Sequence, residues 1–348
     1  GEAVGRNLEL DPEWLGPAVA QFPRFSGKLS GKLRVEKKAG EPAGSGWLEL
    51  HDLRYEGTPH PGRLLLRAEM AGGLVRIADS YFLTGSSRLV LAGEVSWQNG
   101  PAYEIRAEGA DLSCNDLVSL LALTGRPVLE YPAIAGMIDL AVVARGGLRP
   151  EITGHLLARD LSFGSYPVDR GEFSFTWKDG EIYLSDARLL KGTEELFISG
   201  TVNNKGLDLT VTADGLSLSA LAIPGFNHEL AGFLKLDAKI NGTFASPVIS
   251  GEVEAEELAV AGFFLEKAAG TVRWQDEVLS IEEMKVFRGS GELQASGEVA
   301  FKNGPVVDLD LWLKKAEMAE LLRLSGLAPA VPVTGEVTGS CQLLGPLK

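Results

Sequence analysis

Hydrophobic and polar residues alternate one by one along most of the 348-residue chain. The stretch 232–320 shows this most clearly, because Leu234 and Leu236 there alternate with Lys235 and Asp237. Alternation with a period of two is typical of a β-strand that turns one face toward an apolar environment and the other toward water. Short turns separate the alternating runs, which favours an antiparallel meander of strands of roughly eight to twelve residues.

Three landmarks recur in the same order at intervals of roughly a hundred residues, which indicates a repeat protein. They are an opening glycine, a Pro-x-x-x-Gly sequence and a later glycine within an alternating run. In the three full units they fall at Gly31, Gly46 and Gly93, at Gly136, Gly154 and Gly200, and at Gly232, Gly251 and Gly297. With a fourth opening glycine at Gly335, the sequence predicts the tail of a preceding repeat in 1–30. Repeats are then expected in 31–135, 136–231 and 232–334, with the start of a truncated fourth in 335–348.

The alternation also slips by one residue at equivalent places in the repeats. A first slip falls at His51-Asp52, Arg159-Asp160 and Glu256-Glu257, and a second at Asp79, Asp186 and Glu283. A slip adds one residue to a strand and predicts a β-bulge, which bends the strand and helps to curl a sheet.

Short helices are expected between the repeats. Asp11 and Pro12 are suited to the cap and first turn of one helix, and Ser113 or Asn115 to the cap of a second. The segment GLSLSALAIPG leaves room for barely one helical turn after the second repeat, and AELLRLSGL closes the third.

The register of the alternation predicts one apolar face along the whole array. Such a face cannot remain in water. The sheet must close into a sandwich, form a solenoid around its own side chains, or curl lengthwise into a gutter whose lining a ligand covers. The repeated slips favour the curl, whereas an ordinary sandwich core is the commoner explanation of the alternation taken alone.

A family resemblance adds to this pattern. The sequence Gly-x-x-x-x-Pro-x-aliphatic-x-Gly occurs as GTFASPVISG at Gly242–Gly251 and in near form as GGLRPEITG at Gly146–Gly154. With GEVEAEELAV and SGELQASGEVAF, these segments resemble AsmA-like proteins, the TamB family in particular, over nearly the whole chain. The first repeat departs from the pattern, because PAGSG lacks the aliphatic residue.

The resemblance implies a repeating β-groove, U-shaped in section, with an apolar channel along its length. It also implies a bridge between the inner and outer membranes of a two-membrane bacterium and a link to phospholipid transport. For the TamB family it further implies a link to the assembly of outer-membrane proteins.

Pattern and resemblance together predict an all-β protein, an elongated antiparallel repeat array curled into a U-shaped groove with an apolar interior and short helices between repeats. The expected function is a non-enzymatic conduit for phospholipid or another acyl lipid. We expect it in the periplasm or cell envelope, with its membrane anchor outside this fragment and membrane-embedded partner proteins at both ends of the full-length protein. Two alternatives stay open: an assembly factor that binds strands of client barrel proteins at the groove edges, and a structural envelope stalk.

The predicted lipid-groove lining consists of apolar residues from the alternating runs. These are Leu33, Val35, Leu89, Leu91, Ile138, Leu140, Val142, Phe173, Phe175, Trp177, Ile182, Leu184, Leu196, Ile198, Leu207, Leu209, Val211, Leu234, Leu236, Val272, Trp274, Leu279, Ile281, Leu293, Val307, Leu309 and Leu311.

Composition changes this picture little. The formal net charge is -14, from 33 basic and 47 acidic residues without a basic cluster, which makes nucleic acid a poor partner. The four histidines fall in different strands or connectors, and the sequence has neither a nucleophile motif nor a phosphate loop. Neighbouring carboxylates such as Glu256 and Glu257 are expected on opposite faces of a strand. We therefore predict no enzyme activity, no cofactor and no metal site.

Overall fold

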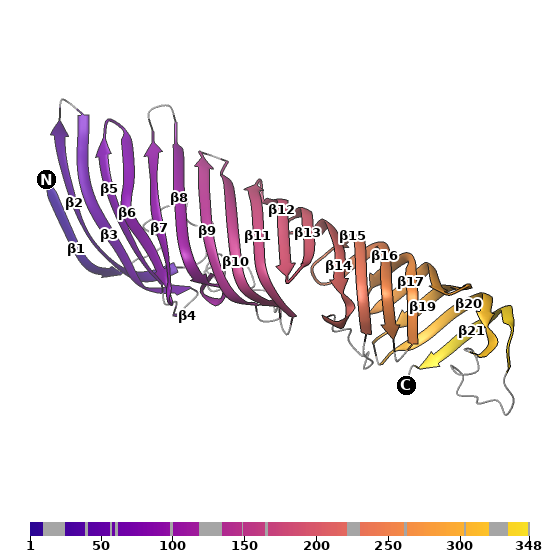
Figure 1. Ribbon diagram of the computed structural model, residues 1–348. Coiled ribbons are helices and arrows are strands. Elements are labelled where there is room, and N and C mark those ends of the chain that lie inside the picture. The colour runs from indigo at the N-terminus through magenta and orange to yellow at the C-terminus, as the bar shows by residue number, and fades with distance from the viewer. Residues whose placement is uncertain are drawn as a thin grey trace. The chain divides into compact units, whose positions relative to one another are not determined.

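The structure is a computed structural model, shown in Figure 1. It describes residues 1–9, 25–38, 41–55, 58–59, 62–97, 100–117, 134–147, 149–163, 166–220, 230–260, 263–302, 304–319 and 333–346. Most of these residues lie in β-strands, which confirms the predicted all-β class. The chain divides into two units, Gly1–Leu189 and Leu190–Lys348, and each is described by itself.

The first unit is an antiparallel meander in which strands pair in chain order. Its strands are β1 Glu2–Glu9, β2 Phe25–Lys38, β3 Glu41–Tyr55, β4 Thr58–Pro59, β5 Gly62–Ala71, β6 Leu74–Thr84, β7 Ser87–Ser96, β8 Ala102–Ser113, β9 Ile134–Gly146, β10 Glu151–Phe163 and β11 Tyr166–Lys178. The two-residue strand β4 pairs with β3, and β3 continues the sheet through β5. Strand β12, Glu181–Lys191, spans the division between the units.

The second unit has the same arrangement. It contains β13 Glu194–Val202, β14 Leu207–Ser217, β15 Leu230–Gly242, β16 Pro247–Val260, β17 Phe263–Gln275, β18 Val278–Arg288, β19 Gly291–Ala300, β20 Val306–Glu317 and β21 Glu336–Pro346. Each strand from β13 to β21 pairs antiparallel with the next. Short turns join most of these strands, as the sequence predicts, while the connections from β14 to β15 and from β20 to β21 are longer.

Within the described ranges, each of the three repeats contributes six long strands in chain order, β2, β3 and β5–β8, then β9–β14, then β15–β20. Described helical residues directly follow the sixth strands, at 114–117, in the 3-10 helix η2 Leu218–Ala220 and at 318–319. The predicted helix after Pro12 and the later parts of the two other predicted helices lie outside the described residues.

The predicted first bulge is confirmed in all three repeats. Asp52, Asp160 and Glu257 adopt left-handed backbone conformations with φ of 52°, 51° and 52°. Asp79 does the same at the second predicted position, and the pairing shifts between Ile281 and Met284 around Glu283. A third bulge lies in the sixth strands at Asp111, Gly215 and Lys315, which the sequence analysis missed.

Two of the opening glycines, Gly136 and Gly232, face the first bulge. A Cβ on Gly136 would lie 2.9 Å from the carbonyl oxygens of both Arg159 and Asp160, in the bulge of the facing strand. Gly232 faces its bulge in the same way. In the first repeat the residue opposite the bulge at Asp52 is Gly27, four positions before Gly31.

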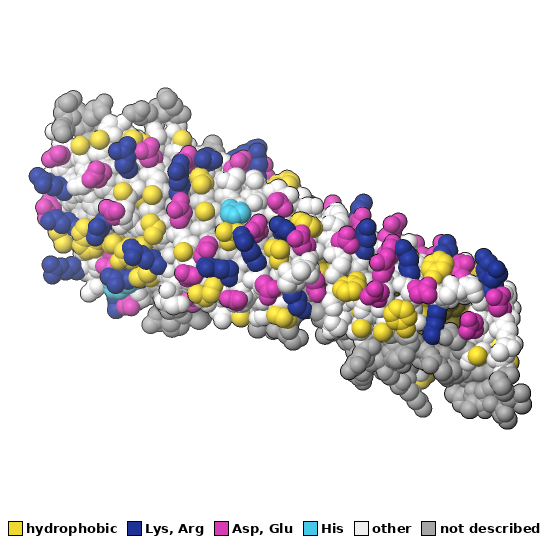
Figure 2. All heavy atoms as spheres, viewed as in Figure 1, with side chains coloured by type: hydrophobic (Ala, Val, Ile, Leu, Met, Phe, Trp, Pro, Cys, Tyr) yellow, Lys and Arg dark blue, Asp and Glu magenta, His cyan; other side chains and the backbone are white. Residues whose placement is uncertain are grey.

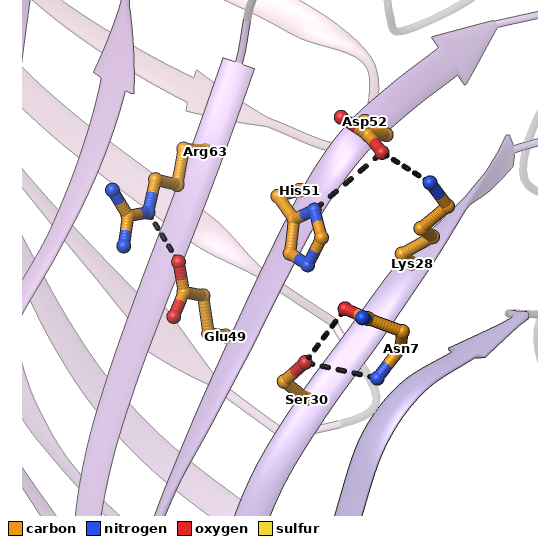
Figure 3. A network of polar contacts seen from close by, with 7 residues as sticks. All are labelled: Asn7, Lys28, Ser30, Glu49, His51, Asp52 and Arg63. Carbon is orange, nitrogen blue, oxygen red and sulfur yellow. Dashed lines mark hydrogen bonds and ion pairs between the residues drawn. The ribbon is translucent and has the colours of Figure 1, made fainter.

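A recurring hydrogen bond joins one repeat to the next. The backbone N–H of the sixth-strand bulge donates to a side-chain oxygen on the following strand, from Asn7 to Ser30 Oγ at 3.1 Å, as Figure 3 shows. The same bond runs from Asp111 to Asp139 Oδ1 at 2.9 Å and from Lys315 to Thr338 Oγ1 at 3.2 Å. By these bonds β1 corresponds to the sixth strand of a preceding repeat. The sequence analysis did not predict a strand at this position. At the junction between the second and third repeats, Lys235 occupies the position of the acceptor residue. Its ammonium group can donate a hydrogen bond but cannot accept one.

We predict that Gly136→Ala lowers the free energy of unfolding by about 1–3 kcal/mol, because the new Cβ meets two carbonyl oxygens at a backbone φ of 136°. Denaturant unfolding followed by circular dichroism measures the change. Gly339→Ala is the matched control, since a Cβ there has nothing within 4 Å, and we expect no loss of stability. Equal effects of the two substitutions would contradict the proposed role of Gly136.

Candidate functional site

The strand register places apolar residues opposite one another across the whole first unit. Directly opposed residues of antiparallel strands point to the same face of the sheet. Following opposed Cα partners outward from Leu33 gives a row without a polar side chain. From β1 to β11 the row contains Ala3, Leu33, Gly46, Ala68, Ile77, Gly93, Ile105, Ala144, Ile152 and Trp177.

Further rows of the first unit lie beside this one and carry no charged side chain. They contain Val35, Gly44, Met70, Val75, Val95 and Tyr103; Leu8, Leu29, Leu50, Leu64, Phe82 and Leu89; Leu91, Ala107, Val142, Gly154 and Phe175; Gly109, Leu140, Leu156 and Phe173; and Leu112, Ile138, Ala158 and Gly171.

The second unit has four such rows. They contain Gly200, Leu209, Ile240, Ile249, Trp274, Leu279, Val299, Val307 and Gly345; Ile198, Val211, Ala238, Gly251, Val272, Ile281, Gly297, Leu309 and Leu343; Leu196, Ala213, Leu236, Val253, Gly270, Met284, Ala295, Leu311 and Cys341; and Leu216, Leu234, Ala255, Ala268, Val286, Leu293, Leu313 and Gly339. We call the rows of both units the apolar rows.

The predicted lining residues can now be placed. Ile182 and Leu184 lie on β12, at the division between the units and outside the rows defined for either unit. Leu207 lies between Val202 and Gly242 in a shorter apolar row at the end of β14. All the other predicted lining residues fall in the apolar rows. That they line a lipid groove stays a prediction.

Many side chains of the apolar rows keep contact with water, unlike those of a closed sandwich core. Leu33 is 53% exposed and Val35 is 38% exposed. Among the described residues, buried apolar side chains form two small clusters, one around Ile138 and Leu161 and one around Leu218 and Ala255. These clusters lie near the bulged ends of the strands, beside helical residues.

One hollow in the first unit opens on the apolar rows. It has a volume of about 610 Å³ and lies over β1, β2, β3, β5 and β6. Its apolar lining includes Leu8, Leu33, Val35, Met70 and Ile77. This hollow is the candidate functional site of the described residues, because it combines concavity with an apolar, partly hydrated wall.

The opposite face of the same strands is charged. One row of the first unit contains Glu2, Arg34, Ser45, Glu69, Arg76, Glu94, Glu104, Arg145, Glu151 and Lys178. Arg145 pairs with Glu104 at 2.9 Å and Arg76 with Glu94 at 3.0 Å, and hydrogen bonds from Arg106 and Arg145 lower the pKa of Glu104. Figure 2 shows charged side chains of both signs spread over the surface. Such exposed pairs keep the face soluble but stabilise the fold little.

The polar residues weighed as catalytic candidates lie on this charged face. Nδ1 of His51 lies 3.7 Å from Asp52 (Figure 3), and Nδ1 of His155 lies 3.2 Å from Ser174 Oγ. His60 and His228 lie outside the described residues. Within the described part of the chain, no cluster of three or more His, Cys, Asp or Glu residues could hold a metal ion. A search of the same residues for a helix long and apolar enough to cross a membrane finds none.

One sequence expectation about these residues is wrong. Neighbouring carboxylates were expected on opposite faces, yet Glu256 and Glu257 are both exposed, and Glu282 and Glu283 line one hollow. The reason is the bulge, whose extra residue leaves two successive side chains on the same side of the strand. The slip in the alternation at these glutamates already predicted the bulge, and with it two successive side chains on one side of the strand.

Comparison with known proteins gives no match to any family model, curated protein or solved structure, so the likeness to AsmA-like proteins rests on the sequence segments alone.

Proposed function

We propose that the apolar rows bind the acyl chains of lipids and that the protein is a non-enzymatic phospholipid conduit. One observation carries the proposal. The apolar rows continue from strand to strand through each unit without a charged side chain, and yet many of their side chains remain partly exposed. A surface of this kind is covered by a ligand or partner in its working state.

The free energy of burial favours an acyl chain as that ligand. An acyl chain of about fifteen methylenes costs on the order of 12 kcal/mol in water, at about 0.8 kcal/mol for each methylene. Contact between the chain and the apolar rows removes both surfaces from water. A head group needs no partner on this face, since it can stay in solvent at the edge of the sheet.

The absence of charge along the rows matters for movement as well as for binding. A charged side chain beneath an acyl chain costs several kcal/mol unless water follows it. Each apolar row of the second unit runs through eight or nine strands of uncharged residues, so a chain can move from strand to strand without meeting such a barrier.

The finer shape and the cellular setting belong to the proposal. We infer that the bulged strands curl the sheet lengthwise into an elongated, U-shaped groove around the chains, because bulges bend strands and increase their twist. The setting would be the periplasm of a two-membrane bacterium, with membrane anchors and membrane-embedded partners beyond this sequence. A stalk with a closed core, the main alternative, would bind no lipid.

The first test concerns the hollow. Leu33→Asp should strongly weaken photocrosslinking of a diazirine-labelled fatty acid to strands β2 and β3, because it places a carboxylate in the apolar lining. Lipid should still bind to the other apolar rows, so the amount of lipid recovered by mass spectrometry after detergent-free purification should fall only in part. Leu33 is half exposed, so the fold should tolerate the change.

Ser45→Asp is the matched control for Leu33→Asp. It adds the same charge one residue away from Gly46 of the same row, but on the charged face between Arg34 and Glu69. We expect normal lipid binding. Unchanged crosslinking to β2 and β3 in a folded Leu33→Asp variant would overturn the assignment of the hollow as a lipid site. No lipid recovered with the unchanged protein would overturn the proposal in favour of a stalk.

The second test concerns passage. Replacing Leu209 and Val211 by Asp in the full-length protein should abolish lipid transfer between membranes, because both residues lie in the apolar rows of β14. Lipid should still bind to the first unit. The measurement is transfer of labelled phospholipid in cells.

Replacing Thr210 and Thr212 by Asp is the control for the second test, because these residues alternate with Leu209 and Val211 and lie on the charged face. Val211 is buried, so circular dichroism must show that the β14 variant folds. Normal transfer by a folded Leu209/Val211 variant would mean that lipid does not travel over these strands.

A further inference from the structure

Trp312 is an aromatic residue in a polar position on β20. Its neighbours Leu311 and Leu313 lie in the apolar rows, so its indole lies on the charged face, between Gln294 of β19 and Ser340 of β21. The side chain is 39% exposed. Part of the indole ring is therefore accessible to a ligand in solution.

A hollow of about 750 Å³ lies beside this ring, and its charged lining is acidic only. Glu282, Glu283 and Asp310 contribute carboxylates, and the lining contains neither Lys nor Arg. The rest of the lining is uncharged and comes from Gln294, Ala295, Ser296, Leu311, Ser340, Cys341 and Gln342 together with Trp312. The bulge in β18 accounts for the density of charge, because it turns both Glu282 and Glu283 into this one hollow.

The carboxylates are only partly neutralised by the chain itself. Glu283 pairs with Lys285 at 2.7 Å. Glu282 and Asp310 form no ion pair within the described part of the chain. Within the described residues no cation lies over the ring of Trp312, in contrast to Tyr81, whose ring centre lies 4.7 Å from the guanidinium of Arg88.

A comparison with Trp47 indicates the sign of the charge that a ligand of Trp312 should carry. It is also 39% exposed on the charged face, but in the first unit, directly between Lys32 and Arg67. The hollow beside it, about 570 Å³, is lined by those two cations with Arg34 and Arg76, as well as by acidic residues. The two tryptophans therefore share exposure and differ in the charge around them.

We propose that Trp312, Asp310 and Glu282 bind an organic cation, the ammonium or guanidinium group of a lysine or arginine on a partner protein. A cation over the face of Trp gains from the ring quadrupole, and adjacent carboxylates add to that attraction. The site lies on the face opposite the apolar rows, so it can hold a protein partner while that face holds lipid. It is independent of the proposed lipid function.

The test labels the 348-residue chain with 5-fluorotryptophan and follows its fluorine NMR signals while tri-lysine is added. The salt concentration is about 150 mM, at which distant charges are screened. Single substitutions assign each fluorine signal. We expect tri-lysine to shift the Trp312 signal and to leave the Trp47 signal unchanged. Asp310→Asn and Trp312→Leu should each weaken binding about threefold, while Trp312→Tyr retains most of it.

Two control ligands complete the experiment. Tri-lysine acetylated on its side chains has the same length without the charge and should not shift Trp312. Maltotriose tests the possibility that the exposed ring stacks on a neutral sugar. The proposal is overturned if the acetylated peptide or the sugar binds as well as tri-lysine, if Trp47 responds equally, or if a folded Trp312→Leu variant keeps full affinity.

Discussion

The cross-strand register is the constraint on which the rest of this structure depends. Side chains alternate between faces, so a slip of one residue in any strand would move all its apolar residues to the charged face. On β16, Ala255 before the bulge and Leu258 after it belong to one apolar cluster, although they are three residues apart in a strand whose side chains alternate. This is possible because the sequence changes phase at the bulge itself, as at Glu256 and Glu257. The apolar rows continue past a bulge only because the hydrophobic pattern of the sequence shifts by one residue where the backbone does.

The glycines follow from the same constraint. Gly136 and Gly232 face bulges whose carbonyl oxygens leave no room for a Cβ, so these positions are fixed by backbone geometry rather than by the chemistry of a site. The same bulge therefore demands the same glycine in two repeats, which is why Gly136 and Gly232 recur at equivalent places in the sequence. In the first repeat the glycine opposite the Asp52 bulge is Gly27 rather than Gly31, and only the strand pairing distinguishes the two.

The sequence predicted the fold class, the strands and the composition of each face, because all three follow from a period of two. It did not predict the sixth-strand bulges at Asp111 and Lys315, where only charged residues mark the slip and the apolar runs beside them are short. It also missed strand β1, which gains its meaning from the bond between Asn7 and Ser30. Contacts between repeats join residues some 23 to 28 positions apart, which local periodicity does not reveal.

The two faces of the sheet can differ in composition because successive side chains along a strand point to opposite faces. At equivalent positions on the charged face the three repeats carry His51, Arg159 and Glu256, of three different charge types. The residues just before them, Leu50, Ala158 and Ala255, are all apolar and all lie in the apolar rows. Only the apolar face keeps the same kind of side chain along the whole of each unit. A single charged side chain on that face costs more free energy than an exposed ion pair on the other face contributes. The charged face can therefore acquire local features such as the acidic hollow at Trp312 without any change to the rows behind it.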